Sequence, residues 1–390
     1  MRYDFDQIIE RRGTDSIKWG LYPDDVLPLW VADMDFVSPE PVVDALRRRV
    51  EHGVFGYGAE PIELRGVLCD HLQKLYDWRV DPEAFVFLPG VVTGFNLVCH
   101  VVGTSGDDVL IQPPIYPPFL SAPTNSDRSA VHAPLTYTGN GYEIDFDAFE
   151  ATITPRTKLF LFCNPHNPTG HVFSRTELER LAEICIRRDL IICSDEIHKD
   201  FVYDGYHHVP IASLGPEVAE RTITLFSPSK TYNIAGLQFS VAVATNPELR
   251  GRLKAATEGI LDVPVNLMGY IAALAAYKQG DEWLFQVLKY LESNRDFVMR
   301  YVRERLPGIT MVEPQGTYLA WLDCRGAGID DEPAKFFLKR AKVVLSKGAL
   351  FGAAGEGFVR LNFGCPRSIL KETLSRMDVA LASLRRASGY

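Results

Sequence analysis

The sequence contains no close pair of cysteines with histidines nearby, no long apolar run and no excess of positive charge. Its seven cysteines are scattered, so they predict neither a zinc site nor a disulfide framework, but small buried side chains in a reducing compartment. The amino terminus alternates charged and apolar residues, unlike a signal peptide, and no segment reaches the ~18 consecutive apolar residues of a membrane-spanning helix. We therefore expect a cytoplasmic protein that holds no metal and does not bind membranes.

Acidic side chains outnumber basic ones. The 50 Asp and Glu residues against 41 Lys and Arg residues give a net charge of −9, without the positive field that binding to nucleic acid requires. The 390 residues, 46% of them hydrophobic, show no repeat or low-complexity tract and are enough for two packed units. We expect a globular protein with no nucleic-acid partner.

Short apolar runs recur between residues 85 and 229, and each ends in Pro, Asn, Ser or Asp: FVFLP, DVLIQPP, KLFLFCNP, LIICSDE and TITLFSPS. Such runs are typical of buried parallel strands. Between the third and fourth runs, Ser174 and Glu177 form a capping box that begins an amphipathic helix, whose apolar face is Leu178, Leu181, Ala182 and Cys185. This unit predicts a mostly parallel sheet with its ligand site beyond the carboxyl ends of the strands.

The pattern changes after residue 280. A long amphipathic stretch, DEWLFQVLKYLESNRDFVMRYVRERL, precedes the strand-like pieces ITMVEP, TYLAWLDC, VVLS and FVRLNF, with helices near PAKFFLKRAK and from Arg367 onward. The first ~45 residues contain Pro-rich loops and no obvious strand of the main sheet. We predict an α/β protein with a large domain at 46–280 and a smaller α+β domain formed by 1–45 and 281–390.

Lys230 is the first candidate for chemistry. It lies in SPSKTYNIAG, directly after a predicted strand and beside Ser227 and Ser229. A lysine in such a confined site loses its proton readily and can form an imine with a carbonyl cofactor. A surface lysine in a polar loop would fit the same local pattern.

Asp195 follows the run LIICS, where its carboxylate could keep the ring nitrogen of a pyridine cofactor protonated, or could cap a helix. His198 could bond the phenolic oxygen of that cofactor, or be an ordinary loop histidine. Asn164 and Asn167 each precede a proline in CNPHNPTG, which would hold their amides extended toward the crevice of Asp195. A turn rich in Asn, Pro and Gly is the alternative.

Four further residues are candidates for binding. Val92 and Thr93, in LPGVVTGFNLV, lie near a predicted helix start whose free amides would bind phosphate, without a Walker lysine or a dinucleotide glycine triplet beside them. Tyr116, between the prolines of QPPIYPPF, could lie flat on an aromatic cofactor or pack in the core. Arg360, in FVRLNF, suits bidentate capture of an α-carboxylate, or a structural ion pair.

Taken in this order, the motifs resemble those of fold-type-I pyridoxal-phosphate enzymes, the class I/II aminotransferase superfamily with the aspartate-aminotransferase fold. The likeness covers nearly the whole chain. Within the superfamily, the sequence most resembles the cystathionine β-lyase (C–S lyase) branch typified by MalY and PatB, through WVADMDF, HGVFGYG, SDEIHKDF, SPSKTYNIAGLQ and FVRLNFGCPRS.

The resemblance assigns a role to each candidate. It implies that Lys230 binds pyridoxal 5′-phosphate as a Schiff base, that Asp195 holds its ring nitrogen and that Asn167 holds its phenolic oxygen. Tyr116 would stack on the ring, and Arg360 would bind the carboxylate of an amino-acid substrate. The phosphate would be held by one further set of residues, Val92, Thr93, Ser227, Ser229 and, from the second subunit of a homodimer, Tyr57.

The same resemblance implies a reaction. His198 stands where many aminotransferases carry tyrosine and Gln238 where many carry arginine, and both departures are shared with the β-lyase branch. We expect β-elimination, in which Lys230 removes the α-proton of cystathionine or another cysteine S-conjugate and thiol, pyruvate and ammonia are formed. An aminotransferase would use the same residues, whereas a regulatory binding protein would not need them all. Residues 30–36 and 316–318 would shape the pocket.

Overall fold

Each of the five apolar runs between residues 85 and 229 forms a strand of one seven-stranded sheet in the computed structural model, which describes residues 2–261 and 265–387. The strand order is β2-β10-β9-β8-β7-β3-β4, and the pairs β9–β8, β8–β7, β7–β3 and β3–β4 are parallel. The predicted mostly parallel sheet is confirmed. Its strands are β2 Phe85–Leu88, β3 Asp108–Ile111, β4 Ser129–His132, β7 Thr157–Cys163, β8 Ile191–Asp195, β9 Thr222–Phe226 and β10 Ser240–Ala244.

Strand β10 was not predicted, and it runs antiparallel to both of its neighbours, β2 and β9. Only thirteen residues separate the end of β9 from the start of β10, and no long crossover helix lies among them. A connection this short returns the chain beside the strand it has left, which gives an antiparallel pair. Lys230 lies in this return.

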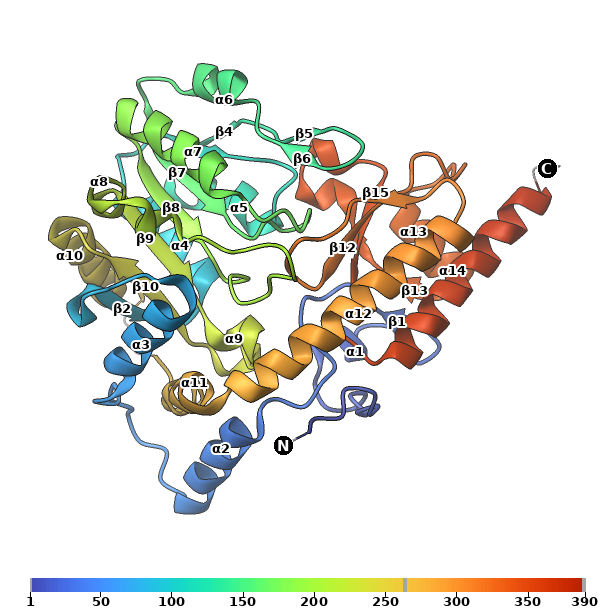
Figure 1. Ribbon diagram of the computed structural model, residues 1–390, viewed down its shortest axis with the longest axis horizontal. Helices are drawn as coiled ribbons and strands as arrows, with labels where there is room; N and C mark the ends of the chain where they lie inside the picture. Colours follow the sequence, from blue (N-terminus) through green and yellow to red (C-terminus); the bar gives the residue numbers. More distant parts are fainter. Residues whose placement is uncertain (1, 262–264, 388–390) are drawn as a thin grey trace.

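Helices cover both faces of the large sheet (Figure 1). The capping box of α7 is present, because the Ser174 hydroxyl accepts from the Glu177 amide at 3.3 Å and the Glu177 carboxylate accepts from the Ser174 amide at 2.7 Å. The predicted apolar face of α7 is buried. The helices up to α11 are α1 Ile17–Gly20, α2 Glu40–His52, α3 Leu64–Tyr76, α4 Val91–Val101, α5 Pro117–Ser121, α6 Phe146–Thr152, α7 Arg175–Arg187, α8 Pro216–Glu220, α9 Pro228–Thr231, α10 Pro247–Ala256 and α11 Leu267–Gln279.

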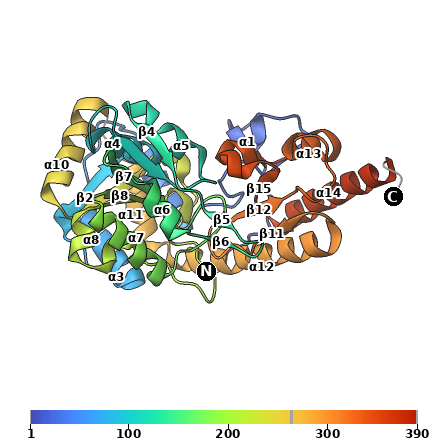
Figure 2. The same ribbon diagram turned by 90° about the horizontal axis from the view of Figure 1, so that it is seen from above.

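A second lobe holds the smaller sheet, and Figure 2 shows the two lobes beside each other with α12 running beneath both. This sheet is antiparallel, in the order β11-β12-β15-β14. The amino-terminal segment joins this lobe, because β1 pairs with β13. The elements here are β1 Leu27–Pro28, β11 Thr310–Met311, β12 Leu319–Asp323, β13 Val343–Val344, β14 Ser346–Lys347, β15 Phe358–Asn362, α12 Asp281–Arg305, α13 Pro333–Ala341 and α14 Arg367–Ala387.

A small hairpin of the large lobe, β5 Thr136–Tyr137 and β6 Tyr142–Glu143, reaches the second sheet, where the Trp321 indole donates to the Tyr142 hydroxyl at 2.9 Å. The exact domain limits at residues 45 and 280 stay a prediction. Six of the seven cysteines are buried and Cys69 is half-buried, and all are free thiols. Among the described residues, no helix combines the length and the apolar character needed to cross a bilayer.

Candidate active site

A cavity of about 260 Å³ opens beyond the carboxyl ends of β7 and β8, where a ligand site of a parallel sheet is expected. Eight of the predicted site residues line it: Val92, Thr93, Tyr116, Asn167, Asp195, His198, Ser229 and Lys230. They come from five separate segments of the chain, so the tertiary fold brings them together. Ala32, Cys163, Ile197, Ala235 and Gln238 complete much of the wall.

Lys230 projects from α9, a single helical turn that begins at Pro228 and is capped by Ser227. Its amine donates a hydrogen bond to the carbonyl oxygen of Ala32 at 2.7 Å. Burial lowers the pKa of Lys230 to about 8, while the carboxylates of Asp33 and Asp195 act in the opposite direction. Close to neutral pH, this amine therefore exchanges a proton far more readily than a surface lysine does.

Asp195 ends β8 and is buried. Its carboxylate accepts a hydrogen bond from the Ile197 amide at 3.0 Å. Burial raises the pKa of Asp195 to about 7, because a carboxylate loses its hydration there. A cationic N–H group placed against this side chain would therefore be strongly bound.

Asn167 and Arg360 lie together, although 193 residues separate them: the guanidinium Nη1 donates to the Asn167 side-chain oxygen at 3.1 Å. Since that oxygen is engaged, the amide nitrogen of Asn167 is left to donate toward the cavity. Arg360 Nη2 also donates to the Trp30 carbonyl at 2.8 Å and to the Ser346 hydroxyl at 3.1 Å. The sequence predicted that the Asn164 amide would also extend toward this crevice, but Asn164 is fully buried and does not line the cavity. Its side-chain oxygen instead accepts from the Phe173 amide at 3.3 Å.

Two rings flank the cavity. Tyr116 precedes α5, and its backbone amide donates to the Asn167 carbonyl at 3.1 Å. His198 is buried, its Nδ1 has no hydrogen-bond partner among the described residues, and its ring meets that of Tyr318 edge-on at 5.8 Å. Burial lowers the pKa of His198 to about 3, so the imidazole is neutral.

The start of α4 forms one end of the cavity. Gly90 precedes the helix without a capping side chain, so the first backbone amides, up to Thr93, are free to meet an anion. Ser229 lines this cavity, but Ser227 does not: its hydroxyl donates to the Phe239 carbonyl at 2.5 Å and accepts from the Ser229 amide at 3.0 Å. Ser227 therefore orders the turn that carries Lys230.

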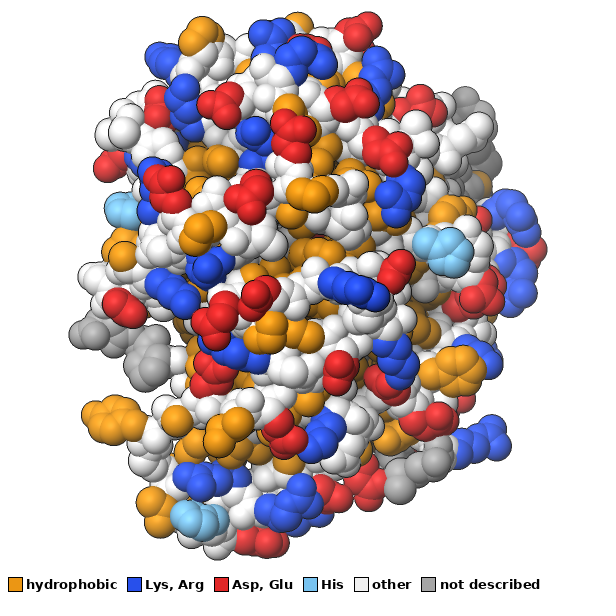
Figure 3. All heavy atoms as spheres, turned by 60° about the vertical axis from the view of Figure 1, so that its left-hand side comes forward, with side chains coloured by type: hydrophobic (Ala, Val, Ile, Leu, Met, Phe, Trp, Pro, Cys, Tyr) orange, Lys and Arg blue, Asp and Glu red, His pale blue; other side chains and the backbone are white. Residues whose placement is uncertain are grey.

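Tyr57 does not line the cavity of its own chain. It is completely exposed, in the segment that runs along the outside of the molecule between α2 and α3 (Figure 1). The predicted pocket segment 30–36 does reach the site through Ala32, whose carbonyl also accepts from the Tyr318 hydroxyl at 2.9 Å. Charges of both signs are interleaved on the face shown in Figure 3, without a basic patch.

The model of the family of aminotransferases of class I and II matches residues 24–377. The chain belongs to this family. It is 38% identical to the cystathionine β-lyase PatB of Bacillus subtilis, over 97% of this chain and 100% of PatB. The crystal structure of OvoB matches 98% of this chain and 100% of that chain, at 45% identity and a TM-score of 0.93.

A further solved relative is cystalysin from Treponema denticola, which contains pyridoxal 5′-phosphate. It is 33% identical, over 98% of this chain and 100% of that chain, with a TM-score of 0.94. The fold and the family expected from the sequence motifs are therefore confirmed, including the likeness to the cystathionine β-lyase branch.

Proposed function

We propose that this protein is a pyridoxal-phosphate-dependent carbon–sulfur β-lyase, which cleaves cystathionine or a related cysteine S-conjugate to a thiol, pyruvate and ammonia. One observation carries the proposal. A buried lysine amine and a buried carboxylate, Lys230 and Asp195, line the same cavity of an aminotransferase-family fold. The cystathionine β-lyase name of PatB supports the choice of reaction.

The residues of the cavity fit the ring of this cofactor. Asp195 can accept a hydrogen bond from the protonated ring nitrogen, which gives its buried carboxylate a cationic partner. The free Nδ1 of His198 and the amide nitrogen of Asn167 suit the phenolic oxygen. Tyr116 would lie against the ring face.

The phosphate group would lie at the start of α4, against the backbone amides of Val92 and Thr93 and the side chain of Ser229. Gln238 lines this cavity in place of the arginine that many aminotransferases carry. In this chain, uncharged hydrogen-bond donors would therefore bind the phosphate, and a donor from a second subunit would add to them.

Arg360 is the proposed site for the α-carboxylate of the substrate. Burial lowers its pKa to about 10, so it stays a cation at neutral pH. The Nε atom of Arg360 is buried without a hydrogen-bond partner among the described residues, so it is one donor that a carboxylate can use. The Asn167 and Ser346 contacts hold the guanidinium plane in place.

When bound, pyridoxal phosphate supplies an aldehyde for the substrate amine and a ring that withdraws electrons from the α-carbon. Lys230 then acts as the base, and its Nζ takes the proton from the α-carbon. Arg360 keeps that carbon in reach by holding the carboxylate. The bond between the β-carbon and sulfur breaks, the thiolate leaves, and the remaining fragment hydrolyses to pyruvate and ammonia.

The test compares lysine variants on cystathionine. We expect the purified wild-type protein to show a yellow absorbance band, a borohydride-trapped adduct at Lys230, and equal amounts of thiol and pyruvate without any added 2-oxo acid. Lys230→Ala removes the base and the site of attachment, and should lose the adduct and at least 10³-fold of the rate, in line with general acid–base catalysis and covalent attachment. Lys254→Ala, at an exposed position of α10, is the control and should behave as wild type.

Turnover that requires an added 2-oxo acid would instead identify an aminotransferase. A protein that binds no cofactor at Lys230 would leave the proposal without support, and a regulatory role that survives Lys230→Ala would replace it.

We also propose a homodimer. The segment between α2 and α3 exposes four apolar side chains close together in sequence, Val54, Phe55, Tyr57 and Ile62. Such a cluster on one exposed segment is typical of a surface covered by another protein. A second copy that buries this segment would also explain why Tyr57 is remote from the cavity of its own chain, since it would then serve the phosphate of the second copy.

A further inference from the structure

The segment 30–36 contacts Lys230 through the Ala32 carbonyl, and its backbone is fixed at several atoms. The Asn362 amide donates to the carbonyls of Val31 and Asp33, both at 2.6 Å. The Ala32 carbonyl accepts from Lys230 on one side and from the Tyr318 hydroxyl on the other. The segment is therefore a rigid wall next to the reactive amine.

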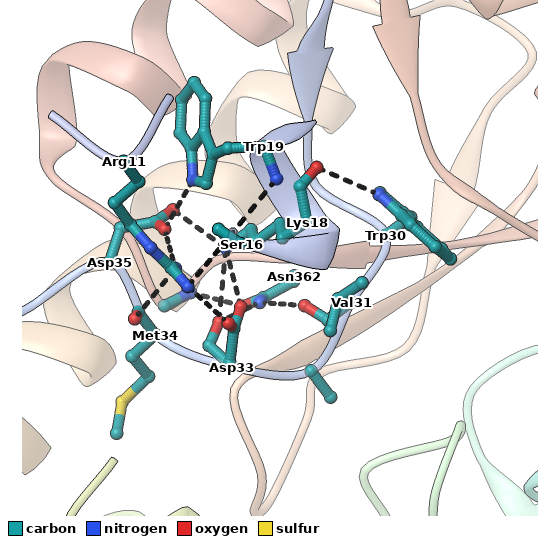
Figure 4. Close-up of polar contacts among 12 residues, drawn as sticks. Arg11, Ser16, Lys18, Trp19, Trp30, Val31, Asp33, Met34, Asp35 and Asn362 are labelled. Atoms are coloured by element: carbon teal, nitrogen blue, oxygen red, sulfur yellow. Dashed lines mark hydrogen bonds and ion pairs between the residues drawn. The ribbon is translucent and has the colours of Figure 1, made fainter. Parts of the chain in front are cut away.

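Two side chains of this segment, Asp33 and Asp35, form ion pairs with Arg11 and Lys18, and we term these four residues the amino-terminal ion network (Figure 4). Lys18 is only 1% exposed, and its amine lies 2.8 Å from Asp35 Oδ2 and 3.4 Å from Asp33 Oδ1. Arg11 donates to both carboxylates, at 2.7 Å to Asp33 and 2.5 Å to Asp35. Two cations and two anions make the network neutral as a whole.

The two carboxylates of the network differ in how fully they are used. Asp35 accepts from Lys18, Arg11 and the Trp19 indole, so both of its oxygens are engaged. Asp33 Oδ1 is buried and makes no hydrogen bond within the described part of the chain. Asp33 also directly follows Ala32, whose carbonyl holds the Lys230 amine.

The electrostatics of Asp33 and Lys230 agree with this arrangement. Burial alone would raise the pKa of Asp33, but Lys18 and Arg11 outweigh it, so the pKa is lowered and the side chain is an anion. Among the charged residues that shift the pKa of Lys230, Asp33 has a larger effect than Arg360 from β15 or Asp195 from β8. His198 is neutral, and burial raises the pKa of the nearby Tyr116 and Tyr318 hydroxyls, so these groups add no charge near neutral pH.

We propose that Asp33 is a positioning residue for the reactive amine: its carboxylate, fixed by Lys18 and Arg11, holds the proton of free Lys230 beside the Ala32 carbonyl and sets the pH range in which that amine accepts a proton. The sequence contains the two acids of WVADMDF, but nothing in it indicates which one influences Lys230. The inference rests on the proposed role of Lys230.

The experiment follows the protonation of Lys230 directly. The full-length chain, stripped of cofactor, is labelled with acetic anhydride between pH 6 and pH 10, and acetylation of the Lys230 peptide is measured by mass spectrometry. Asp33→Asn removes the anion that favours the ammonium form, so the midpoint should fall by about one pH unit or more, as for loss of a nearby opposite charge. Asp33→Glu keeps the charge and should restore most of the wild-type midpoint.

Asp35→Asn is the matched control, since it removes the same charge from the same network at a carboxylate whose two oxygens are both engaged by Lys18, Arg11 and Trp19. Its midpoint should move by less than half as much. Arg11→Gln, at a partly exposed position, removes a cation and should shift the midpoint upward. In the holoenzyme, the pH midpoint of the visible absorbance band should move in the same direction for each variant.

Equal shifts for Asp33→Asn and Asp35→Asn, or no shift for Asp33→Asn, would overturn the inference. If Asp33→Asn does not fold, Arg11→Gln decides alone, and an unchanged midpoint rejects the role of Asp33. Failure of the proposed function is seen separately, as a wild-type Lys230 that borohydride does not trap, because the labelling does not depend on cofactor binding.

Discussion

Arg360 is held in place by structural hydrogen bonds and still has a donor left for a ligand. It is held by Asn167, by the Trp30 carbonyl and by Ser346, yet its Nε has no hydrogen-bond partner among the described residues. A lysine could replace the charge but not the planar fork of donors. The position therefore depends on the guanidinium group itself.

Arg360→Lys should raise KM for the amino-acid substrate with little change in cofactor binding. Loss of charge-assisted hydrogen bonds costs about 1.5–3 kcal/mol, which corresponds to roughly 10- to 150-fold in KM. Ser346→Ala removes only one support of the guanidinium and should raise KM less. Steady-state kinetics on cystathionine and absorbance titration with pyridoxal phosphate measure the two effects. An unchanged KM in Arg360→Lys would remove Arg360 from the substrate site.

Residues with the same local pattern can have different fates in the fold. Asn164 and Asn167 each precede a proline at the end of β7, but only Asn167 lines the cavity. Ser227 caps α9 and Ser229 lies in its first turn, but only Ser229 lines the cavity, because the Ser227 hydroxyl donates to the Phe239 carbonyl. Local sequence placed all four near the site, and the direction of each side chain depended on distant partners.

At the scale of elements, the contact of α4 with the sheet decides where the proposed phosphate site lies. Gly94 faces the sheet, and a Cβ atom there would lie 3.1 Å from side-chain atoms of Leu225 and Leu88. The missing side chain lets the helix approach β9 and β2 closely. The free amides at its start are thereby brought to the rim of the cavity.

Gly94→Leu should push α4 away from the sheet and weaken cofactor binding. Overpacking of this kind costs about 1–3 kcal/mol, and we expect the affinity for pyridoxal phosphate to fall together with the melting temperature. Gly251→Leu is the matched control, because Gly251 lies in helix α10 with open space beside it. Cofactor titration and thermal unfolding of both variants provide the comparison. Equal cofactor affinity in the two variants would argue against a phosphate site at α4.

The apolar pattern of the sequence was sufficient to predict the longer strands and helices, but not the shortest strands. The sequence predicted β7, β8 and β9 because each is a continuous run of five to seven mostly apolar residues. It predicted the start of α7 because the capping box is a local motif. Strand β1 has two residues and includes a proline, so only its partner β13 defines it. Pairing between segments more than 300 residues apart leaves no mark on either segment alone.

At the scale of the whole molecule, the exposed segment between α2 and α3 is the feature that one chain does not explain. Ile62 and Tyr57 are completely exposed. In the proposed dimer, Ile62 would contribute apolar area to the interface, whereas the Tyr57 hydroxyl would reach the phosphate of the second copy. The two residues should therefore respond differently to substitution.

Ile62→Lys should shift the protein toward monomers in sedimentation velocity and reduce its cofactor content, because a charge in an apolar interface is poorly tolerated. Tyr57→Phe should remain a dimer and bind the cofactor more weakly, by about 0.5–1.5 kcal/mol for one lost hydrogen bond. Val379→Lys, at an exposed apolar position of α14, is the control and should change neither. A monomeric wild-type protein with full cofactor content would contradict the proposed dimer.

The sequence by itself determined the mostly parallel sheet, the family, and the residues at the strand ends that meet in the cavity, because apolar periodicity and short polar motifs are local and the carboxyl ends of parallel strands lie at one edge. Only the tertiary structure decided that Arg11, Lys18 and Asp33 form a charged network next to the Ala32 carbonyl that accepts from Lys230. Asp33 and Lys230 are almost two hundred residues apart in the chain, and the energy of a buried ion pair depends on distances that packing alone sets.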